Sequence, residues 1–220
     1  MTSLSNGLSI VVDLRDQFPP VRDQGSRNSC LACSTSDAHA HQQGQPPLAA
    51  EYLLYFAAQN MPGKTASAGL TFVATGLALA GNGQPRESVC PYELMDADGW
   101  LPPTVDKTWH ADLENLDTGL STQIVSSLSK GVPVILGVRL TSGFFTPQQD
   151  SYIIKGDGAV FGGHAVLAVG YGQDQDSNCF LLIRNSWGTG WGCNGHAWLS
   201  LDYLSHNLVG LATVSPKIKN

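Results

Sequence analysis

The chain has 220 residues, of which 42% are hydrophobic and 14% are charged, and its formal net charge is −6. A chain of this length buries a substantial core, as one domain or as two closely joined lobes. The low charge density and the absence of Lys/Arg clusters argue against a nucleic-acid or anionic-membrane surface. The apolar stretches are too short or too interrupted to span a bilayer, and residues 1–9 lack the features of a secretory signal.

The first half of the chain has the apolar spacing and the Ala/Leu content of helices. Helices are predicted over residues 30–43, 48–59 and 70–80. The first of these has Asn28 or Ser29 as its N-cap, and Gly44 ends it. Cys30 then lies in the first turn, where the helix dipole favours a thiolate.

The second half changes to short runs rich in β-forming residues. After a short helix over residues 121–130, strands are predicted over residues 132–141, 165–171, 180–185 and 196–201. Such runs are typical of a twisted antiparallel sheet or a small barrel. The order of the elements therefore predicts an α+β fold.

Three stretches carry residue types that serve acyl transfer. They are Gln24-Gly25-Ser26-Arg27-Asn28-Ser29-Cys30, Gly163-His164-Ala165-Val166 and Arg184-Asn185-Ser186-Trp187-Gly188. Together they supply a thiol, a base, an amide that orients the base and an oxyanion donor. A neutral thiol is a poor nucleophile, so a cysteine that attacks a carbonyl needs a nearby imidazole or a helix N-terminus.

These motifs resemble the papain-like cysteine peptidases, in which the histidine follows the cysteine by roughly 130–150 residues. Further stretches that carry the resemblance are Val12-Asp13-Leu14-Arg15, Cys90-Pro91-Tyr92-Glu93 and Lys130-Gly131-Val132-Pro133-Val134. The resemblance implies a papain-like two-lobe fold, with the active-site cleft between a helical left lobe and an antiparallel β-barrel-like right lobe. We expect residues 8–115 to form the helical lobe with the nucleophile, and residues 116–215 the β lobe with the histidine and asparagine.

The resemblance also implies a role for each residue of the site. Cys30 is the expected nucleophile and forms a thioester, while His164 accepts the thiol proton and later protonates the leaving amine. A thiolate–imidazolium pair is the expected resting state. Asn185 orients the imidazole, Trp187 covers that hydrogen bond, and the Gln24 amide with the Cys30 N–H forms the oxyanion hole. No cofactor is required.

Substrate contacts are expected on both sides of the catalytic residues. Gly69 lies where such enzymes pair a glycine with the substrate backbone, and Leu70 is expected to line the adjoining specificity pocket. Gly163 replaces a bulkier residue and should leave its wall open, while Trp187 completes the expected substrate-binding set. Further candidates for the specificity pocket are Thr71, Ala165 and Val214.

The five cysteines form an odd and sparse set, which indicates a reducing compartment. Arg27 stands where the family usually has a half-cystine. Both features predict a bacterial-type member, located in the cytoplasm or exported without a visible signal peptide. No propeptide is expected, because only a few residues precede Val12-Asp13-Leu14-Arg15, which resembles the start of a mature papain-like domain. A reversible Cys30–Cys33 disulfide that switches the enzyme off is a further hypothesis.

The predicted function is cysteine endopeptidase activity of a monomer on peptide or protein substrates. Its partners are expected to include an inhibitor or immunity-type protein, but no nucleic acid and no membrane. The same triad also serves deamidation or transamidation, and a catalytically idle papain-like fold acts as a binding or effector module.

Two further alternatives rest on the cysteines alone. Cys30-Leu31-Ala32-Cys33 is a Cys-x-x-Cys at a helix start, as in thiol–disulfide oxidoreductases, although no βαβ strand leads into it. Cys30 and Cys33 with Cys193 and His196 have the ligand types of a zinc site. His39 and His41 are two apart on a helix and are predicted to be surface residues.

Overall fold

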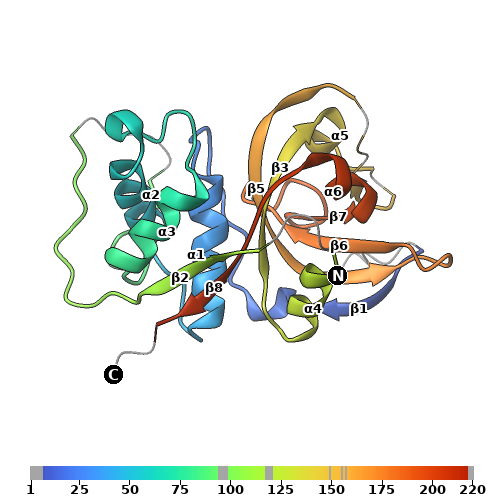
Figure 1. Cartoon of the computed structure of the whole chain (residues 1–220), viewed down its shortest axis with the longest axis horizontal. Helices are drawn as coiled ribbons and strands as arrows, with labels where there is room; N and C mark the ends of the chain where they lie inside the picture. Colours follow the sequence, from blue (N-terminus) through green and yellow to red (C-terminus); the bar gives the residue numbers. More distant parts are fainter. Residues whose placement is uncertain are drawn as a thin grey trace. The chain divides into compact units, whose positions relative to one another are not determined.

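The computed structural model describes residues 7–93, 99–116, 121–148, 150–154, 156 and 158–217. The chain divides into two compact units (Figure 1). One, which we call the strand unit, holds residues 1–23 and 116–211. The other, which we call the helical unit, holds residues 24–115 and 212–220. The α+β class predicted from the sequence is confirmed.

Three helices form the body of the helical unit. They are α1 (Cys30–Gln42), α2 (Ala50–Gln59) and α3 (Phe72–Gly81), with a short 3-10 turn, η2 (Pro62–Lys64), between the last two. The predicted second and third helices begin two residues too early. Leu48 is held in an isolated bridge to Arg86, and the Thr71 side chain caps α3 by accepting a hydrogen bond from the Ala74 N–H at 3.1 Å. None of the described helices has the length and apolar content to cross a bilayer.

His39 is completely buried in the helical unit, so the prediction of a surface histidine is wrong. Its Nδ1–H donates to Gln84 Oε1 at 2.9 Å, and Gln84 Nε2 donates to Ser36 Oγ and to the Ala49 carbonyl. These partners satisfy the polar groups that burial removes from water. Burial lowers the pKa of His39 to about 4, and the hydrogen bond that His39 donates to Gln84 opposes this shift. His41 is half-buried.

A two-stranded ladder completes the helical unit. Strand β2 (Ala111–Asn115) pairs antiparallel with residues 212–216 of β8 (Leu208–Pro216). Helix α3 packs on β2, where Gly76 lies against Leu113. Residues 212–215 were predicted in the β lobe, but this pairing places them in the helical unit.

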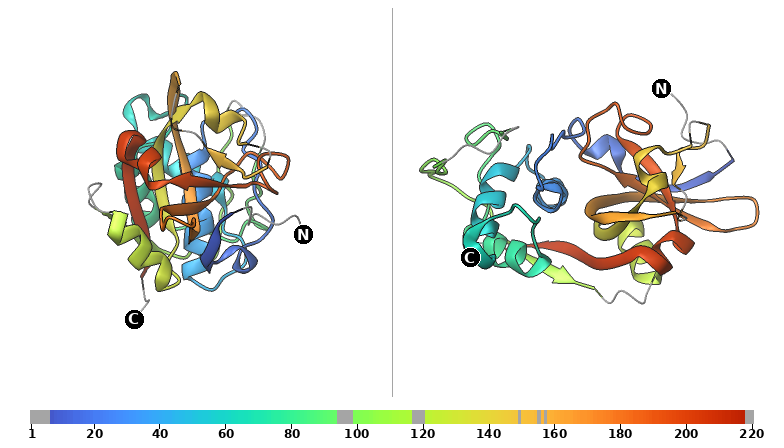
Figure 2. Two further views of the ribbon diagram at one scale, coloured as in Figure 1. Left: turned by 90° about the vertical axis from the view of Figure 1, so that its right-hand side faces the viewer. Right: turned by 90° about the horizontal axis from the view of Figure 1, so that it is seen from above.

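The strand unit is built on one twisted sheet, whose strands run side by side in Figure 2. Its strands are β1 (Ser9–Asp13), β3 (Val134–Thr141), β4 (Ile153–Ile154), β5 (Val160–Gln173), β6 (Cys179–Arg184), β7 (His196–Ser200) and the first part of β8. Their order is β8-β3-β5-β6-β7-β4, with β1 also paired to β5. The pairs β1–β5, β3–β5, β5–β6 and β6–β7 are antiparallel, and β4–β7 is parallel.

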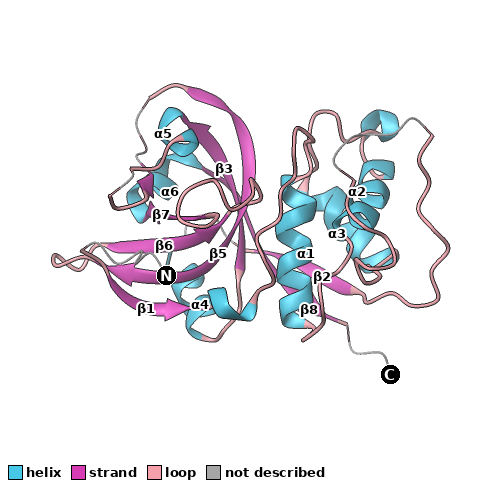
Figure 3. Cartoon of the chain, turned by 180° about the vertical axis from the view of Figure 1, so that it is seen from behind, coloured by secondary structure: helices cyan, strands magenta, loops and turns pink. Residues whose placement is uncertain are grey.

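Short helical segments flank this sheet (Figure 3). They are η1 (Arg15–Gln17), α4 (Ser121–Ser129), α5 (Ser142–Phe145) and α6 (Leu201–Asn207). Trp198, Tyr203 and Phe144 are the largest fully buried side chains of the strand unit. The Tyr203 hydroxyl donates to the Arg139 carbonyl at 2.6 Å, which ties α6 to β3.

Strand β1 overturns the prediction that residues 8–23 belong to the helical lobe. Its residues pair with the far end of β5, from Ser9 opposite Gln173 to Asp13 opposite Gly170. Gly170 permits this approach, because a Cβ there would collide with the Val12 carbonyl. The same strand β5 begins at Val160, five residues earlier than predicted.

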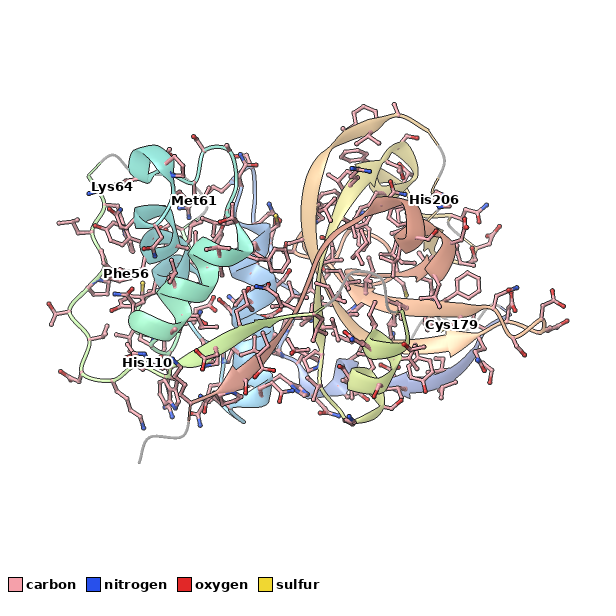
Figure 4. The ribbon with its side chains drawn as sticks, in the orientation of Figure 1. Phe56, Met61, Lys64, His110, Cys179 and His206 are labelled. Carbon is pink, nitrogen blue, oxygen red and sulfur yellow. The ribbon has the colours of Figure 1, made fainter. Side chains whose placement is uncertain are left out.

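A small aromatic cluster supports the outer side of α2. Phe56, labelled in Figure 4, packs with Trp100 and Val105 against the buried residues Ala49, Tyr52 and Cys90. Figure 4 also labels Cys179, at the start of β6, and His206, an exposed residue of α6. No disulfide joins any of the five cysteines. Apolar packing therefore stabilises this part of the helical unit without a covalent link.

We expect the burial of neutral His39 to make stability depend on pH. The folded pKa of about 4 lies below the ordinary value of 6.5, so the unfolded chain binds a proton first as the pH falls. The stability that neutral His39 contributes is therefore fully present above pH 6.5 and is lost progressively toward pH 4. From about pH 7 to about pH 5 this contribution to the free energy of unfolding falls by about 2 kcal/mol.

Urea unfolding at these two pH values tests this for wild type, His39→Gln and His206→Gln. The glutamine at position 39 keeps a donor for Gln84 but does not titrate, so its free energy of unfolding should fall less than that of wild type. The exposed His206 is the matched control and should leave the wild-type difference unchanged. Equal pH dependence in wild type and His39→Gln would contradict the expectation.

Candidate active site

His164 is held in one orientation by a hydrogen bond to Asn185. It lies on β5 opposite Val138 of β3, and its side chain is buried. The distance from His164 Nε2 to Asn185 Oδ1 is 2.7 Å. Because a carbonyl oxygen only accepts, Nε2 carries the hydrogen and Nδ1 is the basic nitrogen. Burial lowers the pKa of His164 to about 4, while the bond to Asn185 opposes that shift.

Asn185 follows β6 and opens a tight glycine-rich turn. Its N–H donates to the Gly195 carbonyl at 3.0 Å, and its Oδ1 also accepts from the Ser186 N–H at 2.8 Å. Gly188 and Gly192 have positive φ angles of 70° and 56°, which favour glycine. The buried Asn185 Nδ2 has no hydrogen-bond partner among the described residues. The amide is thus oriented through its oxygen.

Trp187 covers the imidazole. The centroids of the Trp187 and His164 rings are 4.7 Å apart, with 34° between the ring planes. Phe144, which is fully buried, contacts both rings edge-on at 5.8 and 5.7 Å. The His164–Asn185 bond therefore lies in an aromatic environment, where a hydrogen bond is electrostatically stronger than in water.

Sequence reasoning missed most of these aromatic contacts. Phe145 stacks on Trp187, and Phe161 meets Phe145 edge-on. The Trp191 indole N–H donates to the Phe144 carbonyl at 2.9 Å. The sequence features that could have indicated these contacts are the Phe144-Phe145 pair and the phenylalanine directly before Gly162-Gly163.

Cys30 is the first residue of α1, and its side chain is partly exposed. Ser29 is the N-cap, but its side chain makes no capping hydrogen bond. Its hydroxyl instead lies 2.5 Å from the Tyr92 hydroxyl, and Asn28 Nδ2 donates to the Ser67 carbonyl at 2.6 Å. The first turn of α1 contains no acidic residue that would oppose a thiolate.

Gln24 lies buried in the loop before α1. Its Nε2 donates to the Arg27 carbonyl at 2.7 Å, and its own carbonyl accepts from the Tyr92 hydroxyl at 3.0 Å. Since the Tyr92 proton is used on Gln24, the Ser29 hydroxyl donates to Tyr92. This chain of hydrogen bonds links the predicted oxyanion residue to the residue that precedes Cys30.

Arg27 forms a buried ion pair that the sequence did not indicate. Its two terminal nitrogens donate to the Glu51 carboxylate at 2.5 and 2.9 Å, and Nη1 also donates to the Glu93 carbonyl at 2.6 Å. The side chains of Arg27 and Glu51 are 9% and 4% exposed. The Arg27 guanidinium lies over the Tyr92 ring, 5.3 Å from its centroid. This two-pronged geometry fixes the loop firmly.

The predicted substrate-contact residues occupy varied positions. Gly69 has a φ of 86°, and its N–H already donates to the Ala66 carbonyl at 2.8 Å. Leu70 is half-buried and directly precedes the cap of α3. Gly163 is exposed and lies opposite Arg139 in the β3–β5 ladder. Their contacts with substrate stay predictions.

Each unit brings together part of the predicted set. His164, Asn185 and Trp187 are in contact within the strand unit, while Gln24 and Cys30 belong to one loop and helix start in the helical unit. Over the described ranges, no group of three Cys, His, Asp or Glu side chains is arranged to hold a metal ion. Those residues therefore offer no zinc site.

Comparison with known proteins gives a family match over residues 8–214, to the model described as "Papain family cysteine protease". Among curated relatives, pro-cathepsin H of Bos taurus is 29% identical over 201 residues, which cover 88% of this chain and 58% of that protein. Cathepsin J of Mus musculus is 29% identical over 231 residues, covering 96% and 66%. The chain thus spans less than two thirds of the length of these relatives.

Solved structures show the same fold. Xylellain, a cysteine protease from Xylella fastidiosa, has a TM-score of 0.77 and 21% identity, with 99% of this chain and 90% of that chain covered. The bromelain protease from Ananas comosus, in complex with the inhibitor E64, has a TM-score of 0.70 and 20% identity, with 94% and 98% covered. With the family match over nearly its whole length, the chain belongs to the papain family of cysteine proteases.

Proposed function

We propose that this chain hydrolyses peptide bonds through a thioester formed on Cys30. The observation that carries the proposal is the 2.7 Å bond from His164 Nε2 to Asn185 Oδ1. It leaves Nδ1 as the nitrogen that takes and returns protons, which is what a general base beside a thiol must do. The family membership supports the same reaction class.

The proposed reaction has two halves. Cys30 Sγ transfers its proton to His164 Nδ1 and attacks the peptide carbonyl, and the oxyanion is stabilised by Gln24 Nε2 and the Cys30 N–H. The C–N bond then breaks, and His164 protonates the leaving amine. In the second half His164 removes a proton from water, the hydroxide attacks the thioester, and the Cys30 thiol is restored.

The burial of His164 bears on the resting state. With its pKa lowered to about 4 by burial, the imidazole is neutral near pH 7 unless an anion lies beside it. A thiolate at Cys30 supplies that anion in the proposed ion pair. The bond to the Asn185 carbonyl supports the charged ring as well, because Nε2–H donates more strongly from an imidazolium.

We assign Arg27 a positioning role in this reaction. Its carbonyl accepts from Gln24 Nε2, and its side chain is fixed by Glu51 and Glu93. The amide that faces the oxyanion is thereby held through the backbone of a residue that is itself fixed. Preorganised donors are effective because they need no rearrangement during the reaction.

The substrate in this proposal is a peptide or a protein. The five cysteines, none in a disulfide, suit a reducing compartment such as the cytoplasm. We also propose that an inhibitor or immunity-type protein binds the enzyme and restrains its activity.

A peptide vinyl sulfone that traps activated cysteines tests the proposal directly. Intact mass should show one adduct on wild type and on Cys33→Ala, and none on Cys30→Ala. His164→Ala should react far more slowly, because the thiol loses its base. An adduct on Cys30→Ala, or no adduct on wild type under reducing conditions near neutral pH, would contradict the assignment and favour an idle binding module.

Removal of the orienting amide should weaken turnover without abolishing it. We expect Asn185→Ala to lower kcat by about 100-fold, less than the loss on removal of Cys30 or His164, because members of a triad contribute unequally. Asn178→Ala, which removes an exposed amide from the β5–β6 hairpin, is the control and should keep wild-type kcat. An unchanged kcat in Asn185→Ala would refute the orienting role.

Loss of the Arg27–Glu51 pair should affect both stability and kcat. Glu51→Gln leaves a buried guanidinium without its counter-charge, which costs about 3 kcal/mol in the free energy of unfolding. We expect kcat to fall about 10-fold with little change in KM, since the amide of Gln24 acts on the transition state.

The half-exposed pair of Arg15 with Asp13 supplies the matched control. Asp13→Asn should cost less than about 1 kcal/mol and leave kcat unchanged. Activity is measured without urea, under conditions in which circular dichroism shows that both variants are folded. A Glu51→Gln enzyme that loses stability but keeps kcat would assign the pair a structural role alone.

A further inference from the structure

Three aromatic rings form an exposed surface beside His164. Phe145 at the end of α5 stacks on Trp187, with 5.6 Å between centroids and 15° between planes. Phe161 near the start of β5 meets Phe145 edge-on at 5.5 Å. We call Phe161, Phe145 and Trp187 the aromatic wall. Phe145 and Phe161 are 48% and 63% exposed, and neighbouring exposed apolar side chains favour a binding role.

The aromatic wall is built on a rigid base. Phe144, directly before Phe145, is fully buried and stacks on Trp191 at 5.5 Å and 25°. The Trp191 indole N–H fixes the Phe144 backbone by donating to its carbonyl. The segments that carry the wall, α5 and the start of β5, lie side by side in the strand unit (Figures 1 and 2). The backbone that carries Phe145 is therefore held in place before any ligand arrives.

A hollow of about 790 Å³ adjoins this wall. Its lining includes Phe145, Pro147, Tyr152, Trp187 and Trp191. That volume falls within the range of small-molecule sites and is larger than a single side chain needs. The charged residue in the described lining is Asp150, whose carboxylate disfavours an acidic side chain there.

The reaction fixes which part of a substrate passes this wall. His164 Nδ1 must reach the leaving amine, and the Trp187 ring lies 4.7 Å from the His164 ring. The residues on the amine side of the scissile bond therefore follow the surface that begins at Trp187. This step rests on the proposed function.

We propose that the aromatic wall selects peptides with an aromatic or large aliphatic side chain at one of the first two positions after the scissile bond. Such a side chain covers the exposed faces of Phe145 and Phe161 and enters the hollow. Aromatic rings gain both from apolar burial and from edge or offset contacts with other rings. Acidic side chains lose on both counts, because they forfeit hydration and approach Asp150.

Mass-spectrometric mapping of cleavage sites in a denatured protein substrate tests the proposal. For wild type, aromatic and large aliphatic residues should be enriched at one of these two positions over Gly, Asp and Glu. In Phe145→Ala and Phe161→Ala the enrichment should fall by about 10-fold, as expected for the loss of one aromatic contact. Val209→Ala, which removes an exposed apolar side chain of β8, is the matched control and should keep the wild-type pattern.

The outcomes separate this proposal from the proposed function. Cleavage by wild type without such enrichment, or with enrichment unchanged in both phenylalanine variants, overturns the aromatic wall and leaves the peptidase standing. Absence of any cleavage by wild type overturns both. Vinyl-sulfone labelling of the two variants at the wild-type rate shows that Cys30 and His164 are intact, so that a lost preference is due to the missing ring.

Discussion

The hydrogen bond between His164 and Asn185 is the constraint on which the strand unit depends for its chemistry. Its 2.7 Å length assigns the proton to Nε2 and leaves Nδ1 as a base. The bond forms because β5 and β6 are antiparallel neighbours with Leu167 opposite Arg184. His164, three residues before Leu167, and Asn185, directly after Arg184, therefore lie at the same end of the two strands. Trp187 then excludes water from the bond, at the cost of a His164 pKa lowered to about 4. A neutral, fixed imidazole is the result. In the proposed reaction the imidazole becomes positively charged by taking the proton of the Cys30 thiol rather than a proton from solvent.

In the helical unit an ion pair and hydrogen bonds hold the loop before α1 without a disulfide. A buried ion pair is costly to desolvate and stabilises only when its geometry is good and its remaining groups are satisfied. Arg27 meets both conditions, because it bonds Glu51 through two nitrogens and donates further to the Glu93 carbonyl. The hydroxyls of Ser29 and Tyr92 carry the constraint onward to the carbonyl of Gln24. These polar contacts thus hold the loop as a disulfide would, and reducing conditions do not break them.

Local patterns in the sequence predicted much of this architecture, and long-range partners account for the rest. The expected N-cap at Asn28 or Ser29 and the ending at Gly44 located α1, because helix ends are marked by residues next to them in the sequence. Strand β1 escaped prediction, since it exists only through its pairing with the distant end of β5. His39 was assigned to the surface because its partner Gln84 is 45 residues away. The motifs indicated the pair of His164 and Asn185, which the structure joins by a hydrogen bond, but no local pattern joins Phe145, Phe161 and Trp187 into one surface.

The buried and the exposed residues around His164 differ in what they contribute to the strand unit. Phe144, His164 and Asn185 are buried, so a change in any of them disturbs packing and chemistry together. Phe145 and Phe161 keep about half or more of their surface in water, so they contribute little to folding. Each covers part of the other, which lowers the cost of exposure without removing it. Exposed rings that add little to the core fit the proposed role of the aromatic wall, in which a substrate side chain covers them. Phe145 stacks on Trp187 and Phe161 meets Phe145, so the proposed preference depends on rings that take no part in the bond between His164 and Asn185.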